Sequence, residues 1–129
     1  MKFLFWIVKG IFGLINILPF RIKYIFSDAL SLVLNYVVKY RKKVIKENLE
    51  NSFPEKDQVQ IKHIIKGFYR HLTDLIFEIL KLDTLTKEEL FRRVTVSGED
   101  ILTKLAEQKK GVVVVMSHSG NWEWTSQRV

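Results

Sequence analysis

A histidine and a glutamate near the end of the printed sequence are the residues best suited to chemistry. His118 and Glu123 lie five positions apart and are separated by small or polar residues and one tryptophan. A neutral imidazole can accept a proton from an alcohol, and a carboxylate on its other ring nitrogen fixes the tautomer and stabilises the imidazolium that forms. The pair predicts a general base and its orienting partner, with no serine or cysteine nucleophile.

The residues before His118 predict the element that positions it. Val112 to Val115 are four β-branched residues in a row, bounded by Gly111 and Gly120. Such a run is typical of a strand buried on both faces of an α/β sheet. Ligands of open α/β sheets bind beyond the carboxyl ends of the strands, so we expect His118 at the edge of a site.

The residues after His118 predict a helix. Asn121 is a suitable N-cap, and Trp122 begins a segment that can be helical. Glu123 would then lie in the first turn, and the reversal of the chain would let its carboxylate reach back to the imidazole.

Two other interpretations of these residues are open. His118 can be a loop histidine that bonds to backbone groups, while Glu123 only complements the positive end of a helix. A metal site needs three or four ligands, and the sequence has no cysteine and no second histidine nearby. We therefore expect no metal.

Two segments of the chain carry a resemblance to a known family. Residues 118–123, HSGNWE, resemble the H-x4-D/E box of membrane acyltransferases, in the HxGNWE form typical of the lauroyl and myristoyl type lipid A acyltransferases. Ser119 stands where an aromatic residue is frequent in that family. A second segment, Tyr40–Pro54, resembles another recurring segment of the family in its basic start, its NL pair and its FP pair.

The resemblance implies an O-acyltransferase of lipopolysaccharide biosynthesis. Such an enzyme moves a fatty acyl chain from acyl carrier protein or acyl-CoA to a hydroxyl of a lipid A precursor, a lipid-linked sugar, at the cytoplasmic face of the bacterial inner membrane. It implies His118 as general base, Glu123 as orienter and no bound cofactor. The residues expected to contact the substrate, in part through backbone amides at the helix start, are Ser119, Gly120, Asn121 and Trp122.

The resemblance also implies a fold class, an α/β protein. Membrane-associating helices would precede the start of an α/β/α acyltransferase domain, with a βαβ unit that places the H-x4-E box at a strand end. The chain would correspond to about the first half of such an enzyme, so the chain alone is expected to lack part of the acyl pocket and can be inactive. Glycerolipid acylation, and a membrane-bound interaction protein without turnover, are the alternatives left open.

The positive charge is concentrated in the N-terminal third of the chain. Residues 1–46 contain nine Lys or Arg and a single acid, Asp28, whereas residues 47–129 contain twelve bases and thirteen acids. The basic third is also the most apolar part, which favours an anionic membrane surface and not nucleic acid as the partner. We therefore predict a membrane-associating segment over 1–46 and the start of the acyltransferase domain over 47–129.

Within the basic third, the periodicity predicts two helices and a basic cluster. Phe3–Leu18 is shorter than a perpendicular membrane span requires and predicts an anchor that is interfacial or marginally spanning. A helix is expected over Ile22–Lys39, with polar residues at helical spacing and a wide apolar surface. The basic residues expected at the lipid headgroups are Lys39, Arg41, Lys42 and Lys43.

The rest of the chain shows further helical patterns and a first strand. A long amphipathic helix is expected from Glu55 to Leu82, with a possible break near Gly67. Later segments predict a capped helix start at Thr86–Glu89, a strand at Val94–Val96, a helix over Glu99–Lys110 and a second strand from Val112.

Overall fold

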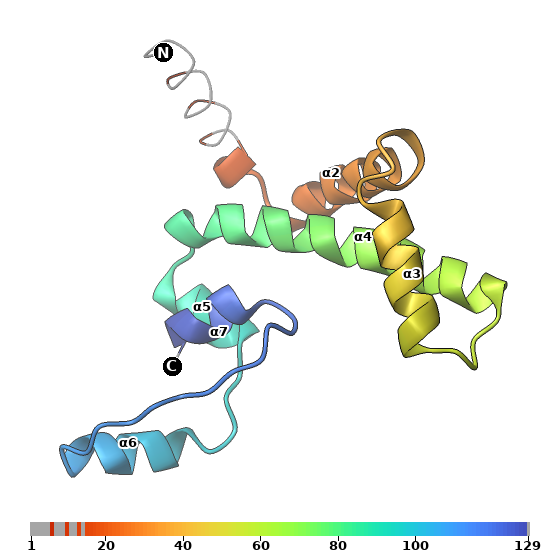
Figure 1. The fold of residues 1–129 in the computed structure, drawn as a ribbon. Coiled ribbons are helices and arrows are strands. Elements are labelled where there is room, and N and C mark those ends of the chain that lie inside the picture. Colours follow the sequence, from red (N-terminus) through yellow and green to blue (C-terminus); the bar gives the residue numbers. More distant parts are fainter. Residues whose placement is uncertain (1–5, 7–9, 11–12, 14, 129) are drawn as a thin grey trace. The chain divides into compact units, whose positions relative to one another are not determined.

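The fold is known from a computed structural model that describes Trp6, Gly10, Gly13 and residues 15–128 (Figure 1). The chain divides into two compact units, residues 1–80 and 81–129. Most of the predicted anchor, Phe3–Leu18, lies outside the described residues. Among the residues that are described, no helix combines the length and the apolar character needed to cross a bilayer.

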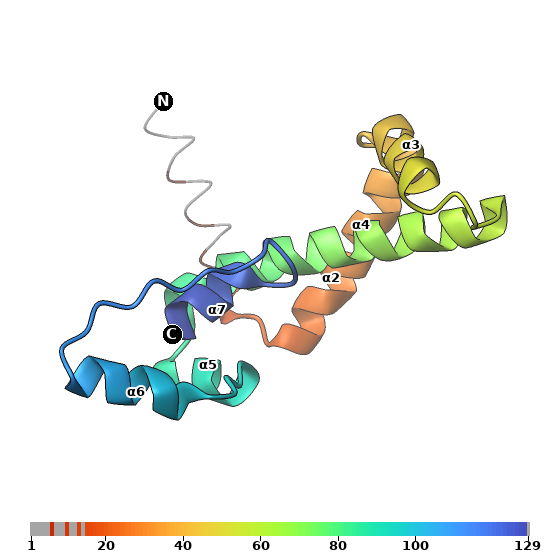
Figure 2. The same ribbon diagram turned by 60° about the horizontal axis from the view of Figure 1, so that its bottom comes forward.

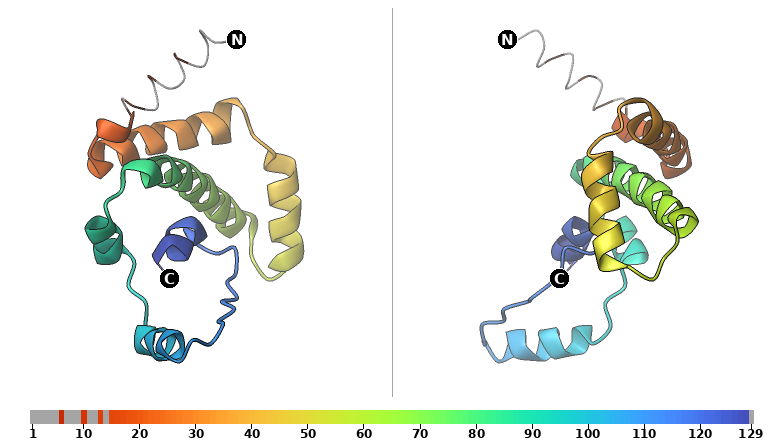
Figure 3. Two further views of the ribbon diagram at one scale, coloured as in Figure 1. Left: turned by 90° about the vertical axis from the view of Figure 1, so that its left-hand side faces the viewer. Right: turned by 45° about the vertical axis from the view of Figure 1, so that its right-hand side comes forward.

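The first unit is built from packed helices. Helix α2 spans Phe20–Leu32 and continues as a short π-helix, η1, over Val33–Val37. Helix α3 spans Lys42–Ser52, and α4 spans Gln58–Lys81. In the views of Figures 1 and 3, α2 and α3 both lie against α4. The predicted helices over 22–39 and 55–82 are thus confirmed, and α4 continues through Gly67 without a break.

The core of this unit gathers on one face of α4. Ile61, Ile65 and Tyr69 follow one another at four-residue spacing and are buried. Side chains from η1 and α3 pack against them: Leu34, Ile45 and Leu49. Burial raises the pKa of the Tyr69 phenol, which stays protonated and donates a hydrogen bond of 2.6 Å to the backbone oxygen of Tyr40. This bond fixes the turn between η1 and α3 to the core.

Helix α2 and its continuation η1 are oriented with their polar side inward. The polar residues Lys23, Ser27, Ser31 and Asn35 are the buried ones, and they recur every four positions. The large apolar residues form what we call the exposed apolar face: Ile22, Ile25, Phe26, Leu32, Val33, Tyr36 and Val37. Because water-facing helices normally show the reverse arrangement, this face is the most unusual feature of the unit.

Polar contacts with α4 explain why the polar side of α2 is buried. The Ser27 hydroxyl donates to Asp74 Oδ1 at 2.6 Å and lies 2.9 Å from Thr73 Oγ1. One turn earlier, the Tyr24 hydroxyl donates to Glu78 Oε1 at 2.8 Å. Buried polar groups that are hydrogen-bonded in this way avoid the desolvation cost of an unpaired group.

The second unit contains shorter helices. A 3-10 turn, η2 (Leu82–Thr84), leads to α5 (Lys87–Arg93), α6 (Glu99–Glu107) and α7 (Trp122–Arg128). Its buried side chains are Leu90 of α5 and Trp124 of α7, and these two helices are in contact. The predicted cap is confirmed, since Thr86 Oγ1 accepts a hydrogen bond of 3.2 Å from the amide of Glu89.

The predicted α/β fold with a βαβ unit is wrong, because the described residues are helical and contain no strand or sheet. Both predicted strands, Val94–Val96 and Val112–Val115, have irregular backbone (Figure 2). Val113 and Val115 are 89% and 90% exposed. A strand is stabilised by ladder hydrogen bonds and by burial. Neither segment pairs with another among the residues described here, and although Val94 and Val96 are half-buried, the run from Val112 to Val115 is exposed.

Candidate functional site

The predicted site lies on the segment that enters α7. Gly120 has φ +64°, in the left-handed region that residues with a side chain rarely adopt, and it turns the chain into the helix. Asn121 Oδ1 then accepts a hydrogen bond of 3.1 Å from the amide of Trp124. The prediction that Asn121 caps a helix beginning at Trp122 is therefore confirmed.

His118 lies on the exposed side of this turn. Its ring packs against Trp122, with the ring centroids 4.8 Å apart and the planes inclined by 47°. A shallow hollow of about 290 Å³ opens on the same turn, and its lining residues are Met116, Ser117, Ser119, Trp122 and Thr125, without His118. Of the residues predicted to contact substrate, Ser119 and Trp122 line this hollow, and Trp122 also contacts the imidazole.

Glu123 is half-buried in the first turn of α7, where a carboxylate complements the positive end of the helix. In the part of the chain that the structure describes, no hydrogen bond or ion pair joins it to His118. Consecutive helical side chains point about 100° apart. Because Trp122 occupies the position beside the imidazole, its neighbour Glu123 is directed elsewhere in this conformation.

The electrostatics of the second unit centre on a different residue pair, which sequence reasoning missed. Arg128 donates from Nη1 and Nη2 to the two carboxylate oxygens of Glu99, at 2.5 and 2.7 Å. Its guanidinium also lies 3.7 Å from the centroid of the Phe91 ring. The hydrogen bonds from Arg128 lower the pKa of Glu99. These contacts connect α7 with α6 and α5, so they support the helix that carries the site.

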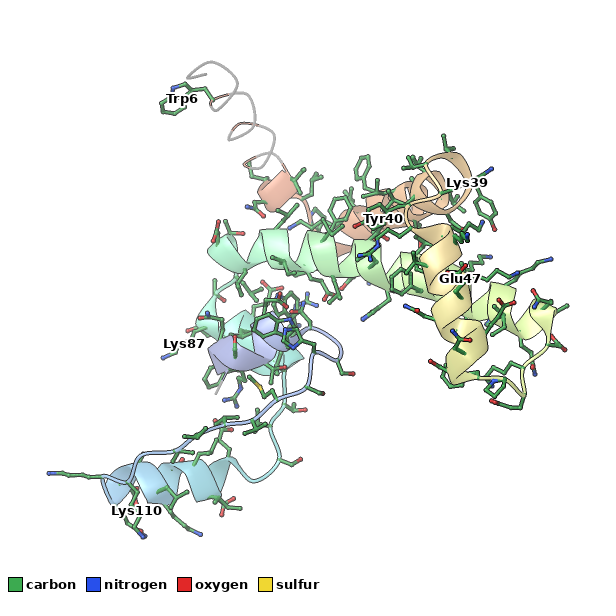
Figure 4. All side chains as sticks on the ribbon, in the orientation of Figure 1. Trp6, Lys39, Tyr40, Glu47, Lys87 and Lys110 are labelled. Atoms are coloured by element: carbon green, nitrogen blue, oxygen red, sulfur yellow. The ribbon has the colours of Figure 1, made fainter. Side chains whose placement is uncertain are left out.

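The predicted basic cluster begins in the turn between η1 and α3, where Figure 4 labels Lys39 and Tyr40, and continues into the first two residues of α3. Lys39 and Arg41 are exposed and have positive φ values of 53° and 49°. Lys43 is exposed beside Glu47, with 3.8 Å between Nζ and Oε1. Lys42 differs, because its ammonium donates to the side-chain and backbone oxygens of Asn35 at 2.8 and 3.1 Å.

A second pair that the sequence analysis did not predict joins α2 and α4. Arg70 donates from Nε and Nη2 to the two oxygens of Asp28, at 2.6 and 2.9 Å. This contact lowers the pKa of Asp28 and raises that of Arg70. Asp28 is the single acid among residues 1–46, and this isolation was the one signal in the sequence that it has a specific partner.

No group of three or more potential metal-ligating side chains occurs within the described ranges. His63 and His71 are both exposed on α4 and are far apart in its sequence.

The sequence matches the family of bacterial lipid A biosynthesis acyltransferases over residues 1–127. Since this match extends over almost all of the 129 residues, the chain belongs to that family. It is accordingly an acyltransferase of lipid A biosynthesis, and the family predicted from the sequence is confirmed. No curated protein and no solved structure shows significant similarity to the chain.

Proposed function

We propose that His118 is the general base of an O-acyl transfer to a lipid A precursor. In this mechanism His118 removes the proton of an acceptor hydroxyl while the hydroxyl oxygen attacks the thioester carbonyl of acyl carrier protein or acyl-CoA. The C–O bond forms, the C–S bond breaks, and the proton held by the imidazole passes to the leaving thiolate. The observation that carries the proposal is the exposed His118 ring on the capped turn, packed against Trp122, within a family of acyltransferases.

Two further features support this role. The tilted contact with Trp122 restricts the rotation of the His118 ring while leaving it open to solvent. The hollow that Trp122 helps to line also contains Ser117, Ser119 and Thr125, whose hydroxyl groups can hydrogen-bond to a polar substrate. We propose that Glu123 orients the imidazole in the substrate complex, since catalytic hydrogen bonds are often long in a free enzyme and tighten when substrate binds.

We also propose attachment to the cytoplasmic face of the bacterial inner membrane. The exposed apolar face of α2 and η1 supports this placement, because covering exposed apolar side chains with lipid lowers the free energy of the protein. The exposed charges of Lys39, Arg41 and Lys43 follow directly after that face and would meet anionic headgroups.

The test of the catalytic role is acyl transfer by the native polypeptide. His118→Ala should lower the rate about 10²- to 10⁴-fold, the range that a positioned general base contributes. The matched control is His71→Ala, which removes an exposed histidine from α4 and should leave the rate unchanged. Equal rates for the His118→Ala and wild-type proteins would show that His118 is not the base.

A further inference from the structure

A polar hollow between α2 and α4 is not used by the proposed mechanism. It has a volume of about 460 Å³ and belongs entirely to the first unit. Its lining residues are Asp28, Ser31, Leu32, His63, Lys66, Gly67 and Arg70. Three of these side chains carry donors and come from one face of α4, at spacings of three and four residues.

The donors of the hollow are not exhausted by contacts within the protein. Asp28 binds Nε and Nη2 of Arg70, which leaves the other N–H groups of the guanidinium available and holds it in a fixed orientation. Lys66 and His63 are exposed and make no hydrogen bond or ion pair with any other described residue. Since Asp28 neutralises Arg70, the hollow retains the uncompensated positive charge of Lys66.

Gly67 forms part of the hollow and has no packing reason to be glycine. A Cβ built at this position meets no atom within 4 Å, although glycine is less favourable than alanine in the interior of a helix such as α4. Because glycine has no side chain, the backbone of α4 is left uncovered between Lys66 and Arg70. A ligand that approaches this backbone closely would explain why glycine occupies position 67.

Apolar surface lies directly beside this polar hollow. Leu32 lines it and belongs to the exposed apolar face, and Ile25 lies on the same side of α2 as Asp28 and Leu32 by helical spacing. A ligand with an anionic head and apolar chains would place the head among the donors and the chains along α2.

We infer that this hollow binds the phosphate group of an anionic membrane lipid. Lys66 and Arg70 contact the phosphate oxygens, His63 contributes a third donor, and Gly67 allows close approach. The inference rests on the membrane attachment proposed above, but it is independent of the chemistry at His118.

The test compares two lysines of α4 in the full native polypeptide. Lys66 lines the hollow, whereas Lys62 is exposed on the same helix and lies outside it. Binding is measured by sedimentation with phosphatidylcholine vesicles, with and without phosphatidic acid. Lys66→Ala should weaken binding to the phosphatidic acid vesicles about fivefold, and Lys62→Ala should weaken it by much less. Equal losses for the two variants would mean unspecific attraction and would overturn the site.

A second variant tests the bare surface at Gly67. Gly67→Ala should raise the midpoint of thermal unfolding, because alanine favours the helix and the space is open, and yet weaken binding to phosphatidic acid vesicles. A stabilised protein whose lipid binding is unchanged would contradict a ligand seated on this surface. Because the variant is expected to be more stable, a loss of binding cannot be attributed to misfolding.

Two controls separate the possible failures. Soluble glycerol phosphate that shifts the NMR signals of the His63 ring, while Lys66→Ala leaves vesicle binding unchanged, would identify a soluble phosphate ligand and refute the lipid. Absence of wild-type binding to either kind of vesicle would refute membrane attachment as well. Binding to both kinds, with no dependence on Lys66, would refute the hollow alone.

Discussion

The exposed apolar face of α2 and η1 leads to a prediction about membrane binding that can be worked out from the structure. Ile25 and Phe26 leave 67% and 54% of their surfaces exposed. Burying a large apolar side chain fully stabilises by about 1.5 to 3 kcal/mol, so covering the exposed parts of both with lipid is worth about 2 to 4 kcal/mol. Replacing both by serine should therefore lower the vesicle partition coefficient by about 30- to 1000-fold.

The assay is sedimentation of the native polypeptide with vesicles of neutral lipid, so that charge plays little part. The matched control is Ile101→Ser, which replaces an apolar residue of α6 that is 59% exposed. This control should leave partition nearly unchanged. The free energy of unfolding of the double variant should fall by about 1 to 2 kcal/mol, because the parts of both side chains that are already buried are lost as well. If the partition coefficient of the double variant fell no further than that of Ile101→Ser, the exposed apolar face would not be the surface that binds lipid.

Further predictions concern single contacts. Asp28→Asn should remove the ion pair with Arg70. Because the pKa of Asp28 is lowered in the folded protein, the pair contributes fully to stability above pH 3.8 and this contribution is lost as the pH falls further. Acid unfolding measures it, and a difference in stability between variant and wild type that stays the same below pH 3.8 would contradict this. Tyr69→Phe should lower the free energy of unfolding by about 1 kcal/mol, because the bond to the Tyr40 oxygen is lost; urea unfolding measures it, and an unchanged midpoint would show that the bond is not needed. Asn121→Ala should destabilise α7 by about 1 kcal/mol through loss of its cap, which amide hydrogen exchange of this helix detects, and Asn121→Asp should retain protection.

Helices in the first unit could be predicted because their signals are local. The spacing of Ile61 and Ile65 with the later apolar residues of α4 defines one helical face, and the same face forms the core. The spacing of apolar and polar residues could not predict which side of α2 is buried. A polar stripe of Ser27 and its neighbours normally faces water, and here it faces Thr73 and Asp74 of α4 because these residues supply hydrogen-bond partners.

The strands were predicted wrongly because strand formation is not a local property. Val112–Val115 have a strong preference for extended backbone, but this preference is expressed as a strand only when neighbouring segments accept the hydrogen bonds and cover the side chains. In the described structure the run is exposed and irregular. The prediction that this segment is part of a paired strand in a βαβ unit was therefore wrong.

The candidate site was predictable in part. The cap at Asn121 follows from side-chain chemistry at a helix start, and the left-handed turn at Gly120 explains why glycine occupies that position. The proximity of Trp122 to His118 was not predictable, because it depends on which of two consecutive helical side chains faces the loop.

The central claim is that His118 and Glu123 act as one unit in acyl transfer, and a double-variant cycle tests it most directly. Initial rates of transfer from an acyl carrier protein thioester to a lipid A precursor are measured with the native polypeptide. The variants are His118→Ala, Glu123→Gln and the two combined. Residues that work as a unit show strongly non-additive losses, so the combined variant should be no slower than His118→Ala alone. Losses that multiply in the combined variant would mean that Glu123 acts independently of the imidazole and would contradict the account.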